Sequence, residues 1–382
     1  MKLRDQADQI RTKLVEVGAF PNSVSVAKTV RDEFPLVGSK EHLKIYEEVV
    51  TTIAGLGPLE NLSKQEGITD ILVNGPKDVW FVDAAGMHKA EICWESETEL
   101  RDFAGHLALQ SSRRLDDSQP FLDVQIANTI RIHAVIPPLS NCGTCLSIRI
   151  AQPQLTKLSD LYERQMFGEQ ALITLKELVT SGASFMISGG TGSGKTTLLG
   201  ALLAEVNPLE RVVAIEDTKE LSVDHPHFVS LQSRSSNSEG AGLVTLRDLV
   251  RQSLRMRPDR LILGEVRGLE IIDLVTALNT GHSGGCATIH ANSASDVPTR
   301  IVSLGLLAGI PVQAMHQLFA SAITVVIELK QLADGLRKIS SLNLVELREG
   351  VADITPVFNW LDGIQFDEGL RKYREVVRRN VT

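Results

Sequence analysis

The stretch that decides the fold runs from Ser184 to Val206 and reads SFMISGGTGSGKTTLLGALLAEV. An apolar strand pattern precedes its glycines, and an apolar helix pattern follows them. The glycines let the backbone curl so that its N–H groups face phosphate oxygens, and the following helix directs its N-terminus at the same anion. Lys195 supplies a charge at the β and γ phosphates, and the Thr196 hydroxyl is a ligand for Mg²⁺. The stretch therefore predicts a phosphate-binding loop for ATP.

Nine consecutive residues are assigned to the nucleotide on this basis: Gly189, Gly190, Thr191, Gly192, Ser193, Gly194, Lys195, Thr196 and Thr197. The alternative is a glycine-rich turn that binds nothing, which the flanking strand and helix patterns disfavour. A dinucleotide-binding fingerprint is excluded, because no G-x-G-x-x-G can be read in this stretch.

Strand and helix patterns alternate through the rest of the C-terminal part of the chain. Apolar strand-type runs occur at 184–188, 211–216, 260–264, 286–289 and 323–328, with helical patterns between them. That order predicts an α/β domain in which helices cover a parallel sheet. Ligands gather at the carboxyl edge of such sheets, so polar residues that end these runs are candidates for the site.

Two of these runs end in acidic residues. Glu265 ends one run, and in phosphate-loop folds such a carboxylate reaches the Mg²⁺ shell or the attacking water. Gly264 stands where an aspartate often binds magnesium, so we expect Glu265 to act alone or through water. A second run ends in EDTKE, whose acids, with Glu216 and Glu220 among them, suit a metal–water shell or a catalytic base. A solvated acidic turn is the alternative for EDTKE.

His282 and His290 cluster near predicted strand ends, where either imidazole could bind a γ-phosphate by a hydrogen bond and report its hydrolysis. The alternative is two histidines that are merely satisfied within the fold. Arg247, Arg251 and Arg255 recur every fourth residue on one helix face. Such a run is typical of a solvated face, and a subunit interface is the alternative.

The region before the phosphate loop has a different pattern. Residues 55–150 are predicted to form a mixed α+β domain, with an amphipathic helix at 97–110 and short strands at 68–73, 79–82, 87–92, 121–126, 129–135 and 146–150. Residues 1–50 show helical spacing, and the proline-containing stretch 151–160 is the predicted linker.

Two pairs of residues in this region carry their own hypotheses. Arg131 and Arg149 lie on predicted strands, either as cross-strand partners or as cations that reach a phosphate. Cys142 and Cys145 form a CxxC in a Gly/Thr turn. We interpret them as incidental turn cysteines, because a structural zinc site needs a second pair and a redox CxxC normally opens a helix.

The composition of the 382 residues restricts the function classes. A net charge of −8 and 4% aromatic residues argue against a protein that coats nucleic acid or stacks on its bases. No run of about 18 apolar residues predicts a membrane-spanning helix, and the N-terminus lacks the core of a signal peptide. We therefore expect a cytoplasmic protein.

Several short motifs together with the phosphate loop make the chain similar to a known family. They are GPLE at 57–60, ITDILVNG at 68–75, IEDT at 215–218, LRMRPDRLILGEVR at 254–267, TGH at 280–282 and TIH at 288–290. Over about residues 50–350 the chain resembles the type II/type IV secretion ATPase superfamily. It is most similar to the CpaF/TadA branch, which serves the assembly of Tad (Flp-type) pili.

The resemblance implies a RecA-like P-loop NTPase domain over 161–382, a PAS-like α+β domain over 55–150, the linker 151–160, and the helical segment 1–50. ATP and Mg²⁺ are the implied cofactors, with nucleotide between the two domains. The implied site residues are Glu216 and Glu220 as acids of the Asp box, Glu265 as the Walker B glutamate, Thr196 and Glu265 toward magnesium, His282 and His290 in the His box, and Arg131 and Arg149 toward phosphate.

The resemblance also implies partners and a place in the cell. It predicts a homo-hexamer that drives pilus assembly or secretion through an inner-membrane platform protein, attached by its partners to the inner face of the cytoplasmic membrane. No direct nucleic-acid contact is expected. A RecA-type nucleic-acid motor and a small-molecule kinase remain the alternatives. The net negative charge and the scarcity of aromatic residues weigh against the nucleic-acid motor. No recognisable lid or acceptor pocket supports the kinase.

Overall fold

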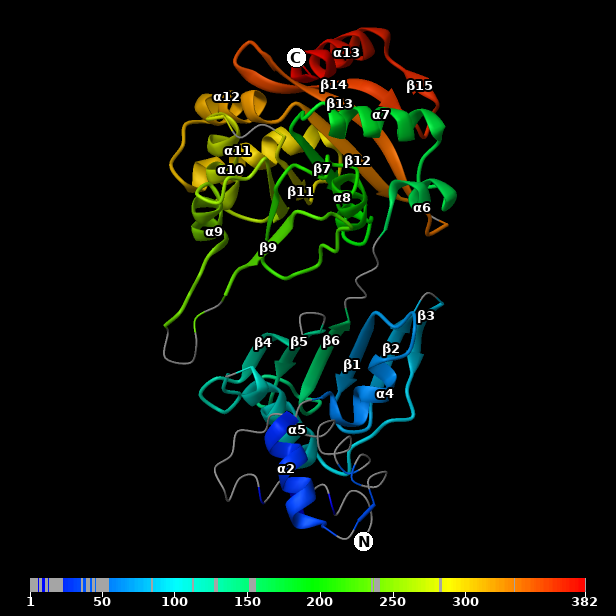
Figure 1. Ribbon diagram of the computed structural model, residues 1–382, viewed down its shortest axis with the longest axis vertical. Coiled ribbons are helices and arrows are strands. Elements are labelled where there is room, and N and C mark those ends of the chain that lie inside the picture. Colours follow the sequence, from blue (N-terminus) through cyan, green and yellow to red (C-terminus); the bar gives the residue numbers. More distant parts are fainter. Residues whose placement is uncertain are drawn as a thin grey trace. The chain divides into compact units, whose positions relative to one another are not determined.

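The computed structural model describes residues 23–35, 55–83, 85–111, 113–126, 130–150, 156–234, 241–281, 284–332 and 334–381, with residues 6, 9, 10, 13, 37, 38, 42, 45 and 236. The chain forms two compact units, Met1–Gln152 and Pro153–Thr382 (Figure 1). The apolar positions Leu3, Leu14, Val17, Leu43, Tyr46, Val49 and Val50, on which part of the helical expectation for 1–50 depends, lie outside the described residues, as does 151–155 of the expected linker.

The first unit is built on a six-stranded antiparallel sheet in the order β3-β2-β1-β6-β5-β4. The strands are β1 (Asp70–Asn74), β2 (Val79–Asp83), β3 (Gly86–Lys89), β4 (Phe121–Ile126), β5 (Ile130–Val135) and β6 (Cys145–Ile150). Its helices are α2 (Ser23–Glu33), η1 (Gly57–Leu59), α4 (Glu60–Ser63) and α5 (Glu97–Gln110). The strand and helix expectations for 68–150 are confirmed within a residue, with two exceptions: β1 begins at Asp70, after the expected 68, and β3 ends at Lys89, before the expected 92.

Helix α5 supplies the core of this unit. Ser96 caps its N-terminus, since the Ser96 hydroxyl accepts a hydrogen bond from the Glu99 backbone N–H. Leu100, Ala104 and Leu107 recur at helical spacing on one face and are buried. They pack into one cluster with sheet residues that include Ile71, Val73, Ile132 and Ile148.

The second unit is built on a nine-stranded sheet in the order β15-β14-β13-β12-β7-β11-β10-β8-β9. Its strands are β7 (Phe185–Gly189), β8 (Val212–Glu216), β9 (Phe228–Gln232), β10 (Arg260–Val266), β11 (Cys286–Ile289), β12 (Val325–Gln331), β13 (Arg337–Arg348), β14 (Val351–Asn359) and β15 (Ile364–Gln365). Six of them, from β12 to β9 in the sheet, pair in parallel. The sequence predicts five of these six; β9, at the edge of the sheet beside β8, was not predicted.

The other three strands correct that prediction. β12, β13, β14 and β15 pair antiparallel in turn, so the sheet is mixed rather than parallel throughout. The cause is local: β13 turns directly into β14 through Glu349 and Gly350, both with positive φ, which is the backbone of a tight hairpin.

Helices cover both faces of the second sheet (Figure 1). They are α6 (Leu158–Glu163), α7 (Glu169–Thr180), α8 (Lys195–Leu203), α9 (Leu246–Ser253), α10 (Glu270–Leu278), η2 (Ala294–Asp296), α11 (Val297–Leu307), α12 (Val312–Ala322) and α13 (Asp367–Val381). Phe185 and Ile187 of β7 pack with α6, α7, α8 and α13, whereas Met186 packs with α9 to α12. Successive side chains of a strand point to opposite faces, so a continuous apolar run serves both layers. Along the described parts of the chain, no helix combines the length and hydropathy needed to cross a membrane.

Gly369 in α13 permits that helix to dock on β14. A Cβ at Gly369 would lie 2.1 Å from the Pro356 carbonyl oxygen, which is backbone and cannot move aside cheaply. Tyr373, one turn further, is buried, and its hydroxyl donates to the Thr174 carbonyl at 2.9 Å.

We expect Gly369→Ala to destabilise the protein by about 1–3 kcal/mol, because the added methyl forces α13 away from β14. Gly105→Ala in α5 is the control: nothing lies within 4 Å of its Cβ position, so we expect a gain of about 0.5–1 kcal/mol there. Urea denaturation of the full chain followed by circular dichroism measures both. A Gly369→Ala protein that unfolds at the same urea concentration as the parent would contradict this account of the docking.

Candidate functional site

The glycine-rich loop connects β7 to α8, at the carboxyl edge of the parallel strands. A Cβ at Gly189 would lie 2.7 Å from both the Leu329 carbonyl oxygen and the Ser193 hydroxyl, so a larger residue does not fit there. Gly194 has φ +94° and precedes the first residue of α8. The loop thus leaves the N-terminus of α8 open to an anion, which is the geometry of a phosphate cradle.

Lys195 is almost fully buried, and its ammonium group has three partners. Nζ donates to the carbonyl oxygens of Gly189 at 3.0 Å and Gly190 at 2.8 Å, and it lies 3.3 Å from His290 Nδ1. Burial lowers the pKa of Lys195, while the charges of Glu265 and Glu220 oppose that shift. The lysine charge is therefore held against the loop, where phosphate oxygens would bind.

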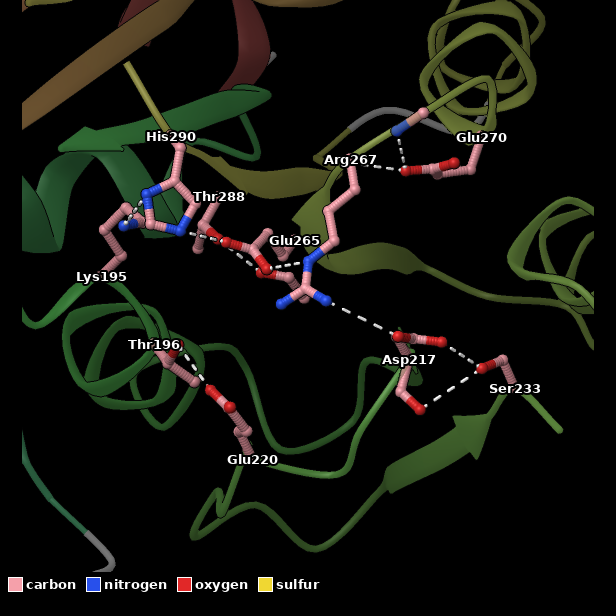
Figure 2. A network of polar contacts seen from close by, with 12 residues as sticks. Lys195, Thr196, Asp217, Glu220, Ser233, Glu265, Arg267, Glu270, Thr288 and His290 are labelled. Carbon is pink, nitrogen blue, oxygen red and sulfur yellow. Dashed lines mark hydrogen bonds and ion pairs between the residues drawn. The ribbon is translucent and has the colours of Figure 1, made fainter. Parts of the chain in front are cut away.

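Glu265 lies near the end of β10, between two nitrogen-bearing side chains (Figure 2). Its Oε1 lies 2.6 Å from His290 Nε2, and its Oε2 accepts a hydrogen bond from Arg267 Nε. The Lys195 ammonium can only donate, so His290 Nδ1 is the acceptor and Nε2 carries the proton that faces Glu265. Burial, then the neighbouring Lys195 charge, lowers the pKa of His290, which favours this neutral imidazole.

A bulge in β10 aims the Glu265 side chain. The register between β10 and β11 shifts between Leu263 and Val266, where three steps on β10 match two on β11. Thr288 of β11 donates to the Gly264 carbonyl oxygen at 2.6 Å and holds this distortion. The bulge and the Thr288 bond set the direction in which the carboxylate leaves the sheet.

Glu216 explains why residue 264 is a glycine. A Cβ at Gly264 would lie 2.8 Å from Glu216 Cγ, so the Glu216 side chain uses the space that an aspartate at 264 would need. Glu216 is 3% exposed. Its Oε1 accepts hydrogen bonds from the N–H groups of Glu220 and Leu221, at 2.9 and 2.8 Å. Oε2 is buried without a hydrogen-bond partner among the described residues, and burial raises the pKa of this carboxyl.

The other two acids after β8 point to different neighbours. Glu220 Oε2 lies 3.5 Å from the Thr196 hydroxyl at the start of α8. Asp217 accepts a hydrogen bond from Ser233 and lies 3.6 Å from Arg267 Nη1 through its other oxygen. Figure 2 shows the result, a chain of polar contacts from Lys195 through His290, Glu265 and Arg267 to Asp217.

The structure thus brings together most of the residues assigned from the sequence. The loop residues 189–197, Glu216, Glu220, Glu265 and His290 meet at one edge of the second sheet. His282, expected to join them, lies outside the described residues.

Arg131 and Arg149 belong to the first unit, where they are register partners on β5 and β6. Arg131 Nε and Nη2 bind the Asp123 carboxylate at 2.9 and 2.6 Å, and Arg149 is exposed on the neighbouring strand. The register also sets Asp70 of β1 beside Arg149. Arg131 therefore forms a cross-strand ion pair with Asp123 on the surface of this sheet.

Arg267 was missed as a site residue by reasoning from the sequence. The signal was present: it stands two residues after Glu265 where a strand ends, and alternate residues share a face. The arginines of α9 have another role. Arg247 and Arg251 both bind Asp273 of α10, at 2.6 and 2.9 Å, so they join two helices of the same unit.

The family model described as "Type II/IV secretion system protein" matches residues 52–348. The chain belongs to this family. Its members hydrolyse ATP, and this secretion-family protein is an ATPase.

Two relatives extend the match over most of the chain. A putative conjugal transfer protein of Mycobacterium tuberculosis is 41% identical over 338 residues, covering 87% of this ATPase and 96% of the relative. The type IV secretion system protein PtlH of Bordetella pertussis is 31% identical over 309 residues, covering 72% and 89%. The solved ATPase DotB of Legionella pneumophila shares the fold, with a TM-score of 0.53 and 20% identity over 84% of this chain and 86% of that one.

Proposed function

We propose that this ATPase is the hexameric motor of a Tad-type pilus or protein-secretion apparatus. It couples ATP hydrolysis to the movement of pilin or secreted protein through an inner-membrane platform protein. The observation that carries the proposal is the Glu265 carboxylate, held between His290 and Arg267 beside the buried Lys195. The motifs shared with the CpaF/TadA branch support the pilus assignment, and the 41% identical putative conjugal transfer protein supports a transport motor.

The residues of the loop fit ATP and Mg²⁺. The glycine cradle suits the phosphates, and Lys195 suits the β and γ phosphate charge. Thr196 and Glu265 are the proposed magnesium ligands, and the carboxylate of Glu220 lies 3.5 Å from the Thr196 hydroxyl. Among the described residues no group of three or more His, Cys, Asp or Glu side chains could hold a metal ion. Mg²⁺ usually takes few protein ligands, and its coordination is completed by water and phosphate oxygens. Bound magnesium would neutralise charge that develops on the transferred phosphoryl group.

The proposed roles follow from the contacts. His290 donates to Glu265 and accepts from Lys195. Its position therefore depends both on the lysine that would bind phosphate and on the carboxylate that would bind the attacking water. Glu265 is the general base for the attacking water, and Glu216 and Glu220 order the metal–water shell near Thr196. His282 is proposed to join His290 as a sensor of the γ-phosphate.

Arg267 is proposed as a positioning residue for Glu265. We expect Arg267→Ala to lower kcat by about 10- to 100-fold while the affinity for ATP changes less than threefold, because the carboxylate loses its orientation and not its charge. Arg267→Lys should restore part of kcat, since lysine keeps the charge but not the fork that reaches both Glu265 and Asp217. Turnover and nucleotide binding are measured separately.

Arg251→Ala is the matched control for Arg267. Arg251 is equally exposed, 54% against 53%, and also binds a carboxylate, but on α9 and α10. A general loss of stability would lower kcat in both variants. A selective loss of ATP affinity in Arg267→Ala would instead make Arg267 a nucleotide ligand and overturn the positioning role.

Arg131 and Arg149 are proposed to bind nucleotide phosphate, as the family resemblance implies. A guanidinium gives planar, bidentate contact with phosphate oxygens that lysine cannot reproduce. We therefore expect Arg131→Lys and Arg149→Lys each to lower turnover at least about tenfold in folded protein. Normal turnover in both variants would leave the two arginines as structural residues of the first sheet.

The finer architecture belongs to the same proposal. The first unit is a PAS-like domain, residues 161–382 form a RecA-like domain, and the protein works at the inner face of the cytoplasmic membrane through its partners. Light scattering of the full chain with a non-hydrolysable ATP analogue should give the mass of six copies, and ATP turnover should not change when DNA is added. Turnover that requires DNA would favour the nucleic-acid motor, and a monomer that phosphorylates a small molecule would favour a kinase.

A further inference from the structure

Cys142 and Cys145 lie close together in the first unit: Cys142 is in the turn before β6, and Cys145 is the first residue of that strand. Their sulfur atoms are 3.3 Å apart, and the Ser140 hydroxyl lies 3.2 Å from each sulfur. Neither the nucleotide chemistry nor the family motifs use these residues. The incidental role expected from the sequence does not account for two thiols that share one hydroxyl.

The backbone between the two cysteines is fixed from outside the turn. Thr144 is fully buried, and both its N–H and its hydroxyl donate to Glu97 Oε1 of α5, at 2.8 and 2.6 Å. The Thr144 carbonyl accepts a hydrogen bond from the Gly75 N–H at 3.1 Å. Gly143 has φ +102°, and a Cβ there would lie 2.4 Å from Glu97 Oε2. The Gly-Thr spacer therefore presents the two thiols on a rigid support.

The two thiols differ in their surroundings. Cys142 is exposed, and hydrogen bonds from Ser140 and then from Cys145 lower the pKa of its thiol. Cys145 is partly buried, and burial raises the pKa of its thiol. An exposed thiol that ionises readily beside a second, less acidic thiol is the arrangement of an attacking and a resolving cysteine.

We propose that Cys142 and Cys145 form a thiol–disulfide exchange site whose substrate is a low-molecular-weight disulfide. The Cys142 thiolate attacks one sulfur of the small disulfide, and its other half leaves as a thiolate. The Cys145 thiolate then attacks Cys142 Sγ and displaces the second half. Two electrons pass from the protein dithiol to the small disulfide, which leaves as two thiols carrying the two protons of the cysteines. The sulfurs must approach by only about 1.3 Å to reach the length of a disulfide bond.

Glutathione disulfide, added to the reduced full chain in buffers of graded glutathione ratio, tests the proposal. Intact mass and peptide mapping should show the loss of two hydrogens in a Cys142–Cys145 peptide. Cys145→Ser should trap one glutathione on Cys142, because no resolving thiol is left. Cys142→Ser should trap at least severalfold less on Cys145. Cys93→Ser is the matched control, since Cys93 is also exposed; its removal should leave the disulfide unchanged.

Ser140→Ala gives a second measurement that does not depend on disulfide formation. Loss of the shared hydroxyl should slow iodoacetamide alkylation of Cys142 severalfold near neutral pH, with Cys93 as the internal reference. Equal trapping of glutathione on Cys93 and Cys142 with no internal disulfide would overturn the proposal. So would purified protein that retains zinc or copper on the two reduced thiols, because the pair would then be a metal site.

Discussion

We expect Lys195→Ala to reduce ATP turnover to background in a protein that still folds. The side chain is nearly buried, and its three contacts all lie on the loop or on His290, so its removal does not disturb the strand order of the sheet. The backbone cradle survives, but no charge remains for the β and γ phosphates, where negative charge gathers during transfer. The loss should be at least about 100- to 1,000-fold, the effect of removing one preorganised electrostatic group.

The control for this variant is another lysine of the same unit. Lys176 of α7 is half exposed and forms a surface ion pair with Glu205 at 3.3 Å, so Lys176→Ala should retain full turnover. Both proteins are compared in ATP hydrolysis and in circular dichroism. Near-normal turnover by a folded Lys195→Ala protein would remove the phosphate-loop assignment and, with it, the proposed motor function.

The sequence predicts best where one physical signal acts alone. The central parallel strands are continuous apolar runs because helices bury both of their faces, and β4, β11 and α5 have the bounds expected from the sequence pattern. The phosphate loop was readable because glycine is required where φ is positive or where Leu329 approaches. These features depend on residues that are adjacent in the chain or on burial, and each of these two causes produces a recognisable pattern of residue types in the sequence.

The hairpin of β13 and β14 is harder to predict, because its sequence pattern is weaker. β13 and β14 carry polar residues such as Ser341 and Thr355 among apolar ones, and their turn, Glu349 and Gly350, lacks the Asn-Gly or Asp-Gly signature of tight hairpins. Gly264 is a similar case. The reason for this glycine is the side chain of Glu216 on a neighbouring strand, a contact between residues far apart in sequence.

The contacts of Glu265 also required the fold. The sequence placed a carboxylate at a strand end but could not show that β10 bulges there, that Thr288 holds the bulge, or that Arg267 closes on Glu265. The two cysteines raise the same point, since a CxxC outside a helix gave no sign that Ser140 would bridge both sulfurs.

Glu265→Gln is expected to keep ATP affinity within a few-fold of the parent and to lower kcat by about 100- to 10,000-fold. The amide has nearly the same shape but cannot take a proton from water. Both neighbours donate to the carboxylate, Arg267 through Nε and His290 through Nε2. The single amide oxygen can accept from only one of them, so the amide nitrogen faces the other donor. His290 cannot relieve this conflict by changing tautomer, because its Nδ1 must then donate toward the Lys195 ammonium.

Two further proteins decide the role of Glu265. Glu205→Gln breaks only the surface pair with Lys176 and should hydrolyse ATP normally. Glu265→Asp keeps the charge on a shorter side chain that cannot reach both neighbours, so its kcat should fall between those of the parent and Glu265→Gln. Binding of a fluorescent ATP analogue with magnesium gives the affinities. If Glu265→Gln binds nucleotide much more weakly while its bound nucleotide is still hydrolysed, Glu265 is a magnesium anchor. The base that activates water must then be sought among the carboxylates that follow β8, with Glu216 and Glu220 first.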